Sequence, residues 1–340
     1  MTVNRRHALG LGGVAAAGVV LGSAATATAA ASDEEEIVAV DAASANRKIA
    51  RTYGRETARA RGTWSSYIAV AGAQAAAVED RADEVVEAYS VNKIAVATAV
   101  LDKVDRGLLA LDQRVDVTAD IVIKDTDGIF GLDGAYPSSV TLGHAMAALL
   151  TLSDNTAVRL CGLVCPAAEL NEILRAKGFT HTQVVPVANP NRFFLGKTTP
   201  RETYTLLQKL VGGTLLSKAS TEYLLNVLRS LSSFTDGIRL NLSSEERLRV
   251  ATKAGWFNDG RNEAGVVFDA EGRPVVTYSL FASGPFAGDA AANDVNFGAT
   301  HPALRARQAI GRTLVDSVGR FSTPAALTFK ARAYQPSNGG

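Results

Sequence analysis

Strand-forming sequence lies at both ends of this chain and is separated by a long helical middle. Near the C-terminus, three consecutive β-rich segments are found at residues 248–257, 265–269 and 274–281. Near the N-terminus, residues 64–71 form a fourth, and Gly72 turns it toward a fifth that ends at Val78. A two-stranded hairpin alone is marginally stable in water. The two groups are therefore expected to pair in one five-stranded antiparallel sheet.

Apolar residues recur at helical spacing through most of the remaining sequence. The expected helices are residues 41–61, 94–109, 140–150, a stretch ending near 164, 167–177, a stretch beginning at 198–200, 218–231 and 302–321. Residues 111–136 are rich in Gly and Asp and are expected to be loops. Helices from the two termini can cover one face of the sheet, while the middle helices cover the other. This order predicts an α/β fold of the α+β type, with an all-helical lobe facing the sheet across a cleft.

The 340 residues carry a formal net charge of +1, with 47% apolar and 20% charged residues. This composition is globular, and the balanced charge gives no support to nucleic acid as a partner. The four histidines and two cysteines form no cluster with metal-ligand spacing, so we expect no metal and no cofactor. Cys161 and Cys165 can form a local disulfide or remain two buried thiols.

The first 31 residues have the organisation of an export signal. Arg5-Arg6 supplies a twin-arginine start, residues 9–21 form an apolar run, and residues 25–31 offer small-residue cleavage sites. The run is short for a membrane span, which needs about 20 residues. We therefore expect cleavage, no stable membrane insertion and a secreted, extracellular product. The expected organisation is a twin-arginine signal at 1–31, one domain at 32–321 and a polar tail at 322–340.

Ser90 and Lys93 form a Ser-x-x-Lys pattern at the start of an apolar helix. Residues three apart lie on the same face of a helix, so the Lys93 amine can lie beside the Ser90 hydroxyl. A serine hydroxyl becomes a good nucleophile only when a base takes its proton. A lysine can be that base if burial or nearby positive charge lowers its pKa.

Two further polar motifs follow in order. Ser153-Asp154-Asn155 lies 63 residues after Ser90, and Lys253-Ala254-Gly255 lies 100 residues after that on a predicted strand. With these motifs the chain resembles class A β-lactamases and penicillin-binding proteins, which read Ser-x-x-Lys, Ser-Asp-Asn and Lys-Thr/Ser-Gly. The resemblance covers about residues 64–280 and implies a serine hydrolase of the β-lactamase/transpeptidase-like fold.

The resemblance also implies a role for each catalytic side chain. Ser90 would be the nucleophile that accepts the acyl group, and Lys93 would help to deprotonate it. Ser153 would relay a proton to the leaving group, and Lys253 would keep that relay polarised.

Substrate-binding roles follow from the same resemblance. Asn155 would hydrogen-bond a substrate amide, while Ala254 and Gly255 would line the substrate. The backbone N–H groups of Ser90 and Trp256 would form an oxyanion hole, in which one donor is often worth ~3 kcal/mol. Arg261 would pair with a substrate carboxylate or be a solvated turn residue.

The sequence departs from the family pattern at two places. Ala254 replaces a Thr or Ser, so one hydroxyl facing the substrate carboxylate is missing. Residues 181–197 contain no Asp or Glu, whereas a class A β-lactamase needs a Glu there to activate the water that removes the acyl group. His181, Asn189 or Asn191 could position water or serve only the loop structure. The motifs therefore predict acylation of Ser90 without efficient β-lactam hydrolysis.

Several functions remain open from the sequence. A hydrolase acting on an amide, ester or β-lactam through acyl-Ser90 is the main prediction. A D,D-peptidase-like cell-wall enzyme and a protein that traps a β-lactam or peptide as a slowly released adduct are the alternatives. The expected partner is a small molecule or a peptidoglycan-like peptide, and we expect a monomer.

Overall fold

The computed structural model describes residues 37–124, 126–185, 195–234, 237–318 and 327–332. The chain divides into residues 1–36 and a compact unit at 37–340, which holds all of the described residues. The predicted export signal and most of the predicted tail lie outside the described residues. Among the residues that are described, no helix is long and apolar enough to cross a membrane.

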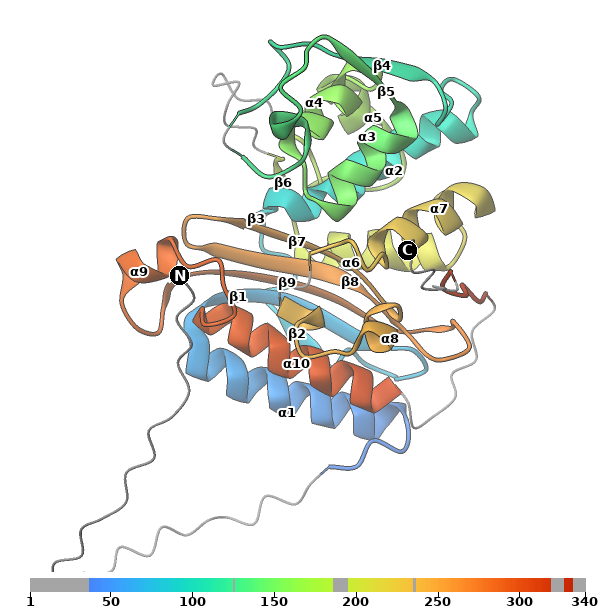
Figure 1. Ribbon diagram of the computed structural model, residues 1–340. Helices are drawn as coiled ribbons and strands as arrows, with labels where there is room; N and C mark the ends of the chain where they lie inside the picture. Colours follow the sequence, from blue (N-terminus) through green and yellow to red (C-terminus); the bar gives the residue numbers. More distant parts are fainter. Residues whose placement is uncertain (1–36, 125, 186–194, 235–236, 319–326, 333–340) are drawn as a thin grey trace, which may run out of the picture. The chain divides into compact units, whose positions relative to one another are not determined.

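One five-stranded antiparallel sheet forms the centre of the fold, as predicted (Figure 1). Its strands are β1 (Arg61–Val70), β2 (Val78–Asp80), β7 (Val250–Phe257), β8 (Gly260–Phe268) and β9 (Pro274–Phe286). Their order is β2-β1-β9-β8-β7, so the N-terminal hairpin pairs with the last strand of the C-terminal group. Strand β7 is therefore an edge strand, and it carries the Lys253 motif.

Two terminal helices cover one face of the sheet, α1 (Ala42–Ala60) and α10 (Pro302–Val318) (Figure 1). Asp41 caps α1, because its carboxylate accepts from the Ser44 N–H at 2.7 Å and the Ser44 hydroxyl accepts in return. The apolar stripes of both helices pack on the sheet through fully buried side chains such as Ile49, Ile68 and Ile310.

The helical lobe lies on the other side of the sheet (Figure 1). Its helices are α2 (Lys93–Asp105), α3 (Leu142–Thr151), α4 (Asn155–Val164) and α5 (Ala167–Ala176), with α6 (Pro200–Val211) and α7 (Lys218–Leu228) nearer the sheet. Helix α6 begins at the predicted cap, where Thr199 accepts from the Glu202 N–H and Pro200 occupies the first turn. Almost every residue of α2 is buried, so this helix places Lys93 inside the lobe.

Short elements complete the fold. They are β3 (Val86–Glu87), β4 (Arg114–Val117), β5 (Ser138–Thr141), β6 (Lys197–Thr198), α8 (Ser244–Arg247), α9 (Ala290–Asp294) and the 3₁₀ turns η1 (Tyr89–Asn92), η2 (Phe130–Leu132) and η3 (Gly237–Arg239). Two further two-stranded sheets form, β3 with β6 and β4 with β5. The β4–β5 pair corrects the prediction that residues 111–136 are all loop.

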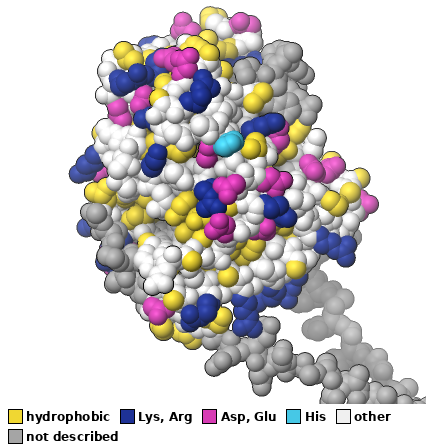
Figure 2. Space-filling model, turned by 180° about the vertical axis from the view of Figure 1, so that it is seen from behind, with side chains coloured by type: hydrophobic (Ala, Val, Ile, Leu, Met, Phe, Trp, Pro, Cys, Tyr) yellow, Lys and Arg dark blue, Asp and Glu magenta, His cyan; other side chains and the backbone are white. Residues whose placement is uncertain are grey.

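Three further details go beyond the sequence analysis. Within the predicted polar tail, Phe329 is buried and its ring packs edge-on against Phe268. Cys161 and Cys165 are free, buried thiols, so the open alternative of a disulfide is not realised. Acidic and basic side chains are interspersed over the face seen in Figure 2, in keeping with the balanced net charge.

Candidate active site

Ser90 lies within η1, the turn that leads into α2, and directly against strand β7. The preceding residue, Tyr89, has a φ of 46°, which turns the chain sharply into the helix. A Cβ added to Gly255 of β7 would lie 2.6 Å from the Ser90 amide nitrogen. The backbones of Ser90 and β7 are therefore in contact, and only glycine permits this approach. The side chain of Ser90 is half-buried, so its hydroxyl lies at the boundary of the lobe.

Lys93 lies one helical turn after Ser90 and is completely buried. Its amine donates to the Ser153 hydroxyl at 3.0 Å and to Asn155 Oδ1 at 2.8 Å, and it also donates to the Ser153 carbonyl. Burial, followed by the charge of Lys253, holds the pKa of Lys93 well below its usual value. A lysine with a depressed pKa can be neutral and accept a proton, which is what a general base requires.

Ser153 connects the two lysines. Its hydroxyl lies 3.0 Å from Lys93 Nζ and 3.0 Å from Lys253 Nζ. Ser153 has a φ of 55°, a conformation that few non-glycine residues adopt. A hydroxyl between two amines can pass a proton from one side to the other. Lys253 is itself held by a bond to the Ala254 carbonyl at 2.6 Å.

The unusual turn at Ser153 is supported by its neighbour Asp154. The Asp154 carboxylate is buried and caps α4 by accepting from the Ala157 N–H at 2.9 Å. It also accepts from the N–H groups of Ile129 at 2.6 Å and Phe130 at 3.0 Å. Asp154 therefore acts by positioning, because it fixes both the Ser153 turn and the loop that faces it.

Asn155 completes the second motif and borders the loop before η2. Its amide oxygen accepts from Lys93, and its amide nitrogen donates to Thr126 Oγ1 at 2.6 Å. The side chain is thus oriented from both ends. Hydrogen bonds join Lys93, Ser153, Asn155 and Lys253, and the Ser90 backbone lies against Gly255 on the same strand as Lys253.

Arg261 does not join this group. It pairs with Trp256 across β7 and β8, and Trp256 is three positions from Lys253, so Arg261 lies on the opposite face of the sheet from Lys253. Its guanidinium is fully buried and donates to the carbonyls of Gly260 at 2.8 Å and Asn293 at 2.8 Å. Arg261 is therefore neither a solvated turn residue nor a group exposed to pair with a substrate carboxylate.

Ala254 and Trp256 share this opposite side-chain direction, because they alternate with Lys253 and Gly255 along the strand. The Ala254 side chain is buried and presents no polar group. Trp256 is half-buried and its ring lies beside Phe297, with 4.3 Å between ring centroids. The side chains of Ala254 and Trp256 therefore point away from the face of the strand that carries Lys253.

Two residues that the sequence analysis missed hold the segment without carboxylates. Asn92 donates from Nδ2 to the carbonyl of Leu195, which ties the Ser90 turn to this segment. Glu202 accepts from the N–H groups of His181 at 3.0 Å and Thr182 at 2.7 Å. Burial opposes ionisation of Glu202, but bonds from Thr182 and His181 outweigh it and lower the pKa. Glu202 stands at the third position of its helix after the cap Thr199, a capping-box spacing that could have identified it.

His181 belongs to the base of the same segment. Its ring Nδ1 lies 2.9 Å from Glu202 Oε1, and its side chain is 53% exposed. This contact orients the His181 ring toward Glu202. Asn189 and Asn191, the other residues considered for water, lie outside the described residues.

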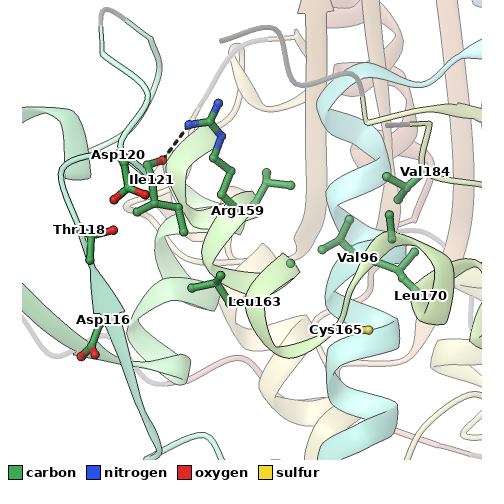
Figure 3. Close-up of a pocket in the computed structure, with 13 residues that line it drawn as sticks. Val96, Asp116, Thr118, Asp120, Ile121, Arg159, Leu163, Cys165, Leu170 and Val184 are labelled. Atoms are coloured by element: carbon green, nitrogen blue, oxygen red, sulfur yellow. Dashed lines mark hydrogen bonds between the residues drawn. The ribbon is translucent and has the colours of Figure 1, made fainter. Parts of the chain in front are cut away.

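A separate pocket of about 640 Å³ lies within the helical lobe (Figure 3). Its apolar wall includes Val96, Val158 and Leu170, and Arg159 at its rim donates to the Ile121 carbonyl at 3.0 Å. None of the residues of the three motifs lines it. It is therefore distinct from the Ser90 cluster.

Comparisons with known proteins identify the family and the fold. Residues 44–318 match the Beta-lactamase2 family, described as a β-lactamase enzyme family. No curated protein matches the sequence significantly.

Solved structures show the same fold. A β-lactamase from Xanthomonas campestris is 22% identical, with a TM-score of 0.67 over 81% of this chain and 99% of that one. A β-lactamase from Chitinophaga pinensis is 22% identical, with a TM-score of 0.68 over 79% and 98%. A mutant of PBP-A, solved as an acyl-enzyme complex with penicillin G, is 20% identical, with a TM-score of 0.63 over 79% and 96%.

Proposed function

Because the chain belongs to the β-lactamase enzyme family and is a serine hydrolase, we propose that it cleaves an amide, ester or β-lactam through an acyl-Ser90 intermediate. The observation that carries this proposal is the Ser153 hydroxyl, which lies 3.0 Å from the amines of both Lys93 and Lys253. In this arrangement Lys93 would be the base and Ser153 the proton relay for Ser90.

The proposed acylation step balances within the cluster. Ser90 Oγ attacks the substrate carbonyl carbon while neutral Lys93 takes the hydroxyl proton. The carbonyl π electrons move to oxygen, where the N–H groups of Ser90 and Trp256 would stabilise the charge. The carbon–leaving group bond then breaks, Ser153 gives its proton to the leaving group, and protonated Lys93 restores the Ser153 proton along their 3.0 Å contact. Lys253 keeps the Ser153 oxygen polarised from the other side.

Release of the acyl group is proposed to be slow. Residues 181–197 contain no Asp or Glu to activate water. Among the described residues at the ends of this segment, His181 is engaged by Glu202. We therefore expect inefficient β-lactam turnover, and a protein that holds a β-lactam or wall peptide as a lasting adduct is the second candidate function. The twin-arginine signal at 1–31 supports a secreted protein, where both kinds of substrate would be met.

Intact-mass spectrometry can test the proposal. The mature protein is incubated with a fluorescent penicillin or with a fluorophosphonate, which labels activated serines whatever their natural substrate. We expect both adducts on Ser90 and none on Ser90→Ala. The penicillin adduct should persist for many minutes, whereas rapid loss with repeated turnover would contradict the missing deacylation base. Failure of the fluorophosphonate to label Ser90 would overturn the acyl-Ser90 mechanism itself.

A further inference from the structure

Helix α1 concentrates positive charge on one part of the surface. Its 19 residues include five Lys or Arg and one Glu, a net charge of +4. The whole chain has a formal net charge of +1, so the rest of the chain is net negative. We propose that the exposed side of α1, together with Arg305 of α10, is a docking surface for a linear phosphodiester polymer of the cell envelope. This surface is called the basic surface below.

The arginines of α1 lie in a row. One recurs every four residues, at Arg47, Arg51, Arg55 and Arg59, a spacing that places side chains along one face of a helix. At a rise of 1.5 Å per residue, the row is about 18 Å long. Arg47, Arg55 and Arg59 are exposed, and Figure 2 shows Lys and Arg side chains at the lower edge of the molecule, at the height of α1 in Figure 1. The row can therefore contact several successive phosphates of one extended polymer.

The one carboxylate of α1 is already paired. Glu56 accepts from Arg55 Nε at 2.7 Å and from Arg59 Nη1 at 3.1 Å. Its side chain is 12% exposed, whereas that of Arg59 is 69% exposed. Two guanidiniums share this single negative charge, and each guanidinium has five N–H donors. Arg55 and Arg59 therefore keep both positive charge and donors for a phosphate group.

The row ends at a hollow between α1 and α10. The hollow has a volume of about 380 Å³ and is lined by Arg59, Arg305 and Glu56, and the rest of its lining is uncharged. Two guanidiniums at one hollow suit a phosphate, because each can make two parallel hydrogen bonds to phosphate oxygens. Asp41 and the acidic residues 33–36 precede α1 in the sequence. We therefore place the strongest contact in the hollow, at the other end of the helix.

The basic surface suits a polymer better than a lipid bilayer. A helix that binds a bilayer surface inserts apolar side chains into it. Within α1, all of which the structure describes, no large apolar side chain is exposed, because the apolar stripe of the helix packs on the sheet. Val38 and Val40 are exposed, but they precede the helix, at the end away from Arg59. Contacts made by the basic surface would thus be made by guanidiniums.

The basic surface and Ser90 lie on different sides of the sheet. Helix α1 covers one face, whereas Ser90 precedes α2 of the helical lobe on the other (Figure 1). A polymer bound along α1 would therefore not cover Ser90. The twin-arginine signal predicts a secreted protein, which would meet such polymers outside the cell. The basic surface would hold the protein on the envelope, and it does so whether or not Ser90 forms an acyl-enzyme.

The test measures binding of the mature protein to fluorescein-labelled poly(glycerol phosphate) by fluorescence anisotropy. With about four phosphate contacts, log affinity should fall against log salt with a slope of about −3, a loss of about 60-fold between about 50 and 200 mM NaCl. The triple variant Arg55→Gln/Arg59→Gln/Arg305→Gln should bind at least about tenfold more weakly at the lower salt concentration, with a slope of about −1.

The matched control is Arg114→Gln/Arg175→Gln/Lys218→Gln, which removes the same charge from exposed positions of the helical lobe. Its affinity should stay within about threefold of the wild type. An equal loss in both triple variants would show that net charge alone governs binding and would overturn the proposal. Absence of saturable binding at about 50 mM NaCl, or tighter binding to phosphatidylglycerol vesicles than to the polymer, would overturn it as well. Arg305→Glu, which leaves both Glu56 bonds intact, should also weaken binding and serves as the test if the triple variant does not fold.

Discussion

Removing the charge of Lys253 should move the pH dependence of Ser90 acylation to higher pH. Lys93 must be neutral to take the Ser90 proton, and its pKa is held down first by burial and next by the charge of Lys253. Lys253→Met removes the repulsion from Lys253 and leaves Lys93 buried. The pKa of Lys93 then rises, so at a given pH below this pKa a smaller fraction of Lys93 is neutral.

The size of the effect follows from the geometry. Both amines lie 3.0 Å from the same Ser153 oxygen, so they are at most 6.0 Å apart. Two unit charges at about 5–6 Å repel by ~3 kcal/mol at an effective dielectric constant of about 20. Relaxation and water entry after the substitution reduce this figure. Because the substitution removes this repulsion, we expect the midpoint of the acylation profile to rise.

The assay measures the rate of fluorophosphonate labelling between pH 5 and pH 10. Lys253→Arg is the matched control, because it retains the charge while changing the shape of the side chain. Its labelling can be slower at every pH, but its midpoint should stay near that of the wild type. An unchanged or lower midpoint in Lys253→Met would refute the view that charge repulsion from Lys253 helps to keep Lys93 neutral.

Three further substitutions or reactions have defined outcomes. Gly255→Ala places a Cβ 2.6 Å from the Ser90 nitrogen and would push Ser90 away from β7. We expect labelling of Ser90 to slow by at least about 100-fold, as when one oxyanion-hole donor is lost. Near-normal labelling would show that β7 and Ser90 are not in contact. Asp154→Ala removes the cap of α4 and two hydrogen bonds to the loop before η2. The free energy of unfolding, measured in urea, should therefore fall by ~2–4 kcal/mol. A fall of less than about 1 kcal/mol would contradict the positioning role of Asp154. Burial raises the pKa of Cys161 to about 12 and of Cys165 to about 11, so Ellman's reagent at pH 8 should react with both only after unfolding.

The sheet and the catalytic cluster were predictable from the sequence for separate reasons. A short hairpin is not stable alone, so the strands at the two ends of the chain were expected to pair. The observed sheet confirms this, because β1 pairs with β9. The motif residues were selected by their chemistry and spacing, and the structure places the amines of Lys93 and Lys253 on the Ser153 hydroxyl, with the Ser90 backbone against Gly255. The bridging position of Ser153 needed the structure, because a φ of 55° for a serine has no sequence signal.

Arg261 shows where sequence reasoning fails. The number of residues between Arg261 and the third motif can be read from the sequence. The face of the sheet on which the Arg261 side chain lies depends on the register of β7 with β8. A shift of one residue in a sheet sends every side chain to the opposite face. The observed register pairs Arg261 with Trp256, which directs its guanidinium toward α9 and the loop that follows it.

The proposed mechanism places acylation and release of the acyl group in different parts of the molecule. The residues proposed to form the acyl-enzyme lie in buried elements, with Lys93 fully buried in α2 and Lys253 in β7. The segment without carboxylates is attached to them through Asn92, whose amide reaches Leu195, and is held at its base by Glu202. Changes within that segment can alter the fate of the acyl group while leaving the contacts of Lys93 and Ser153 in place. On this proposal, the residues that form the acyl-enzyme and the segment that governs its removal can change independently of one another.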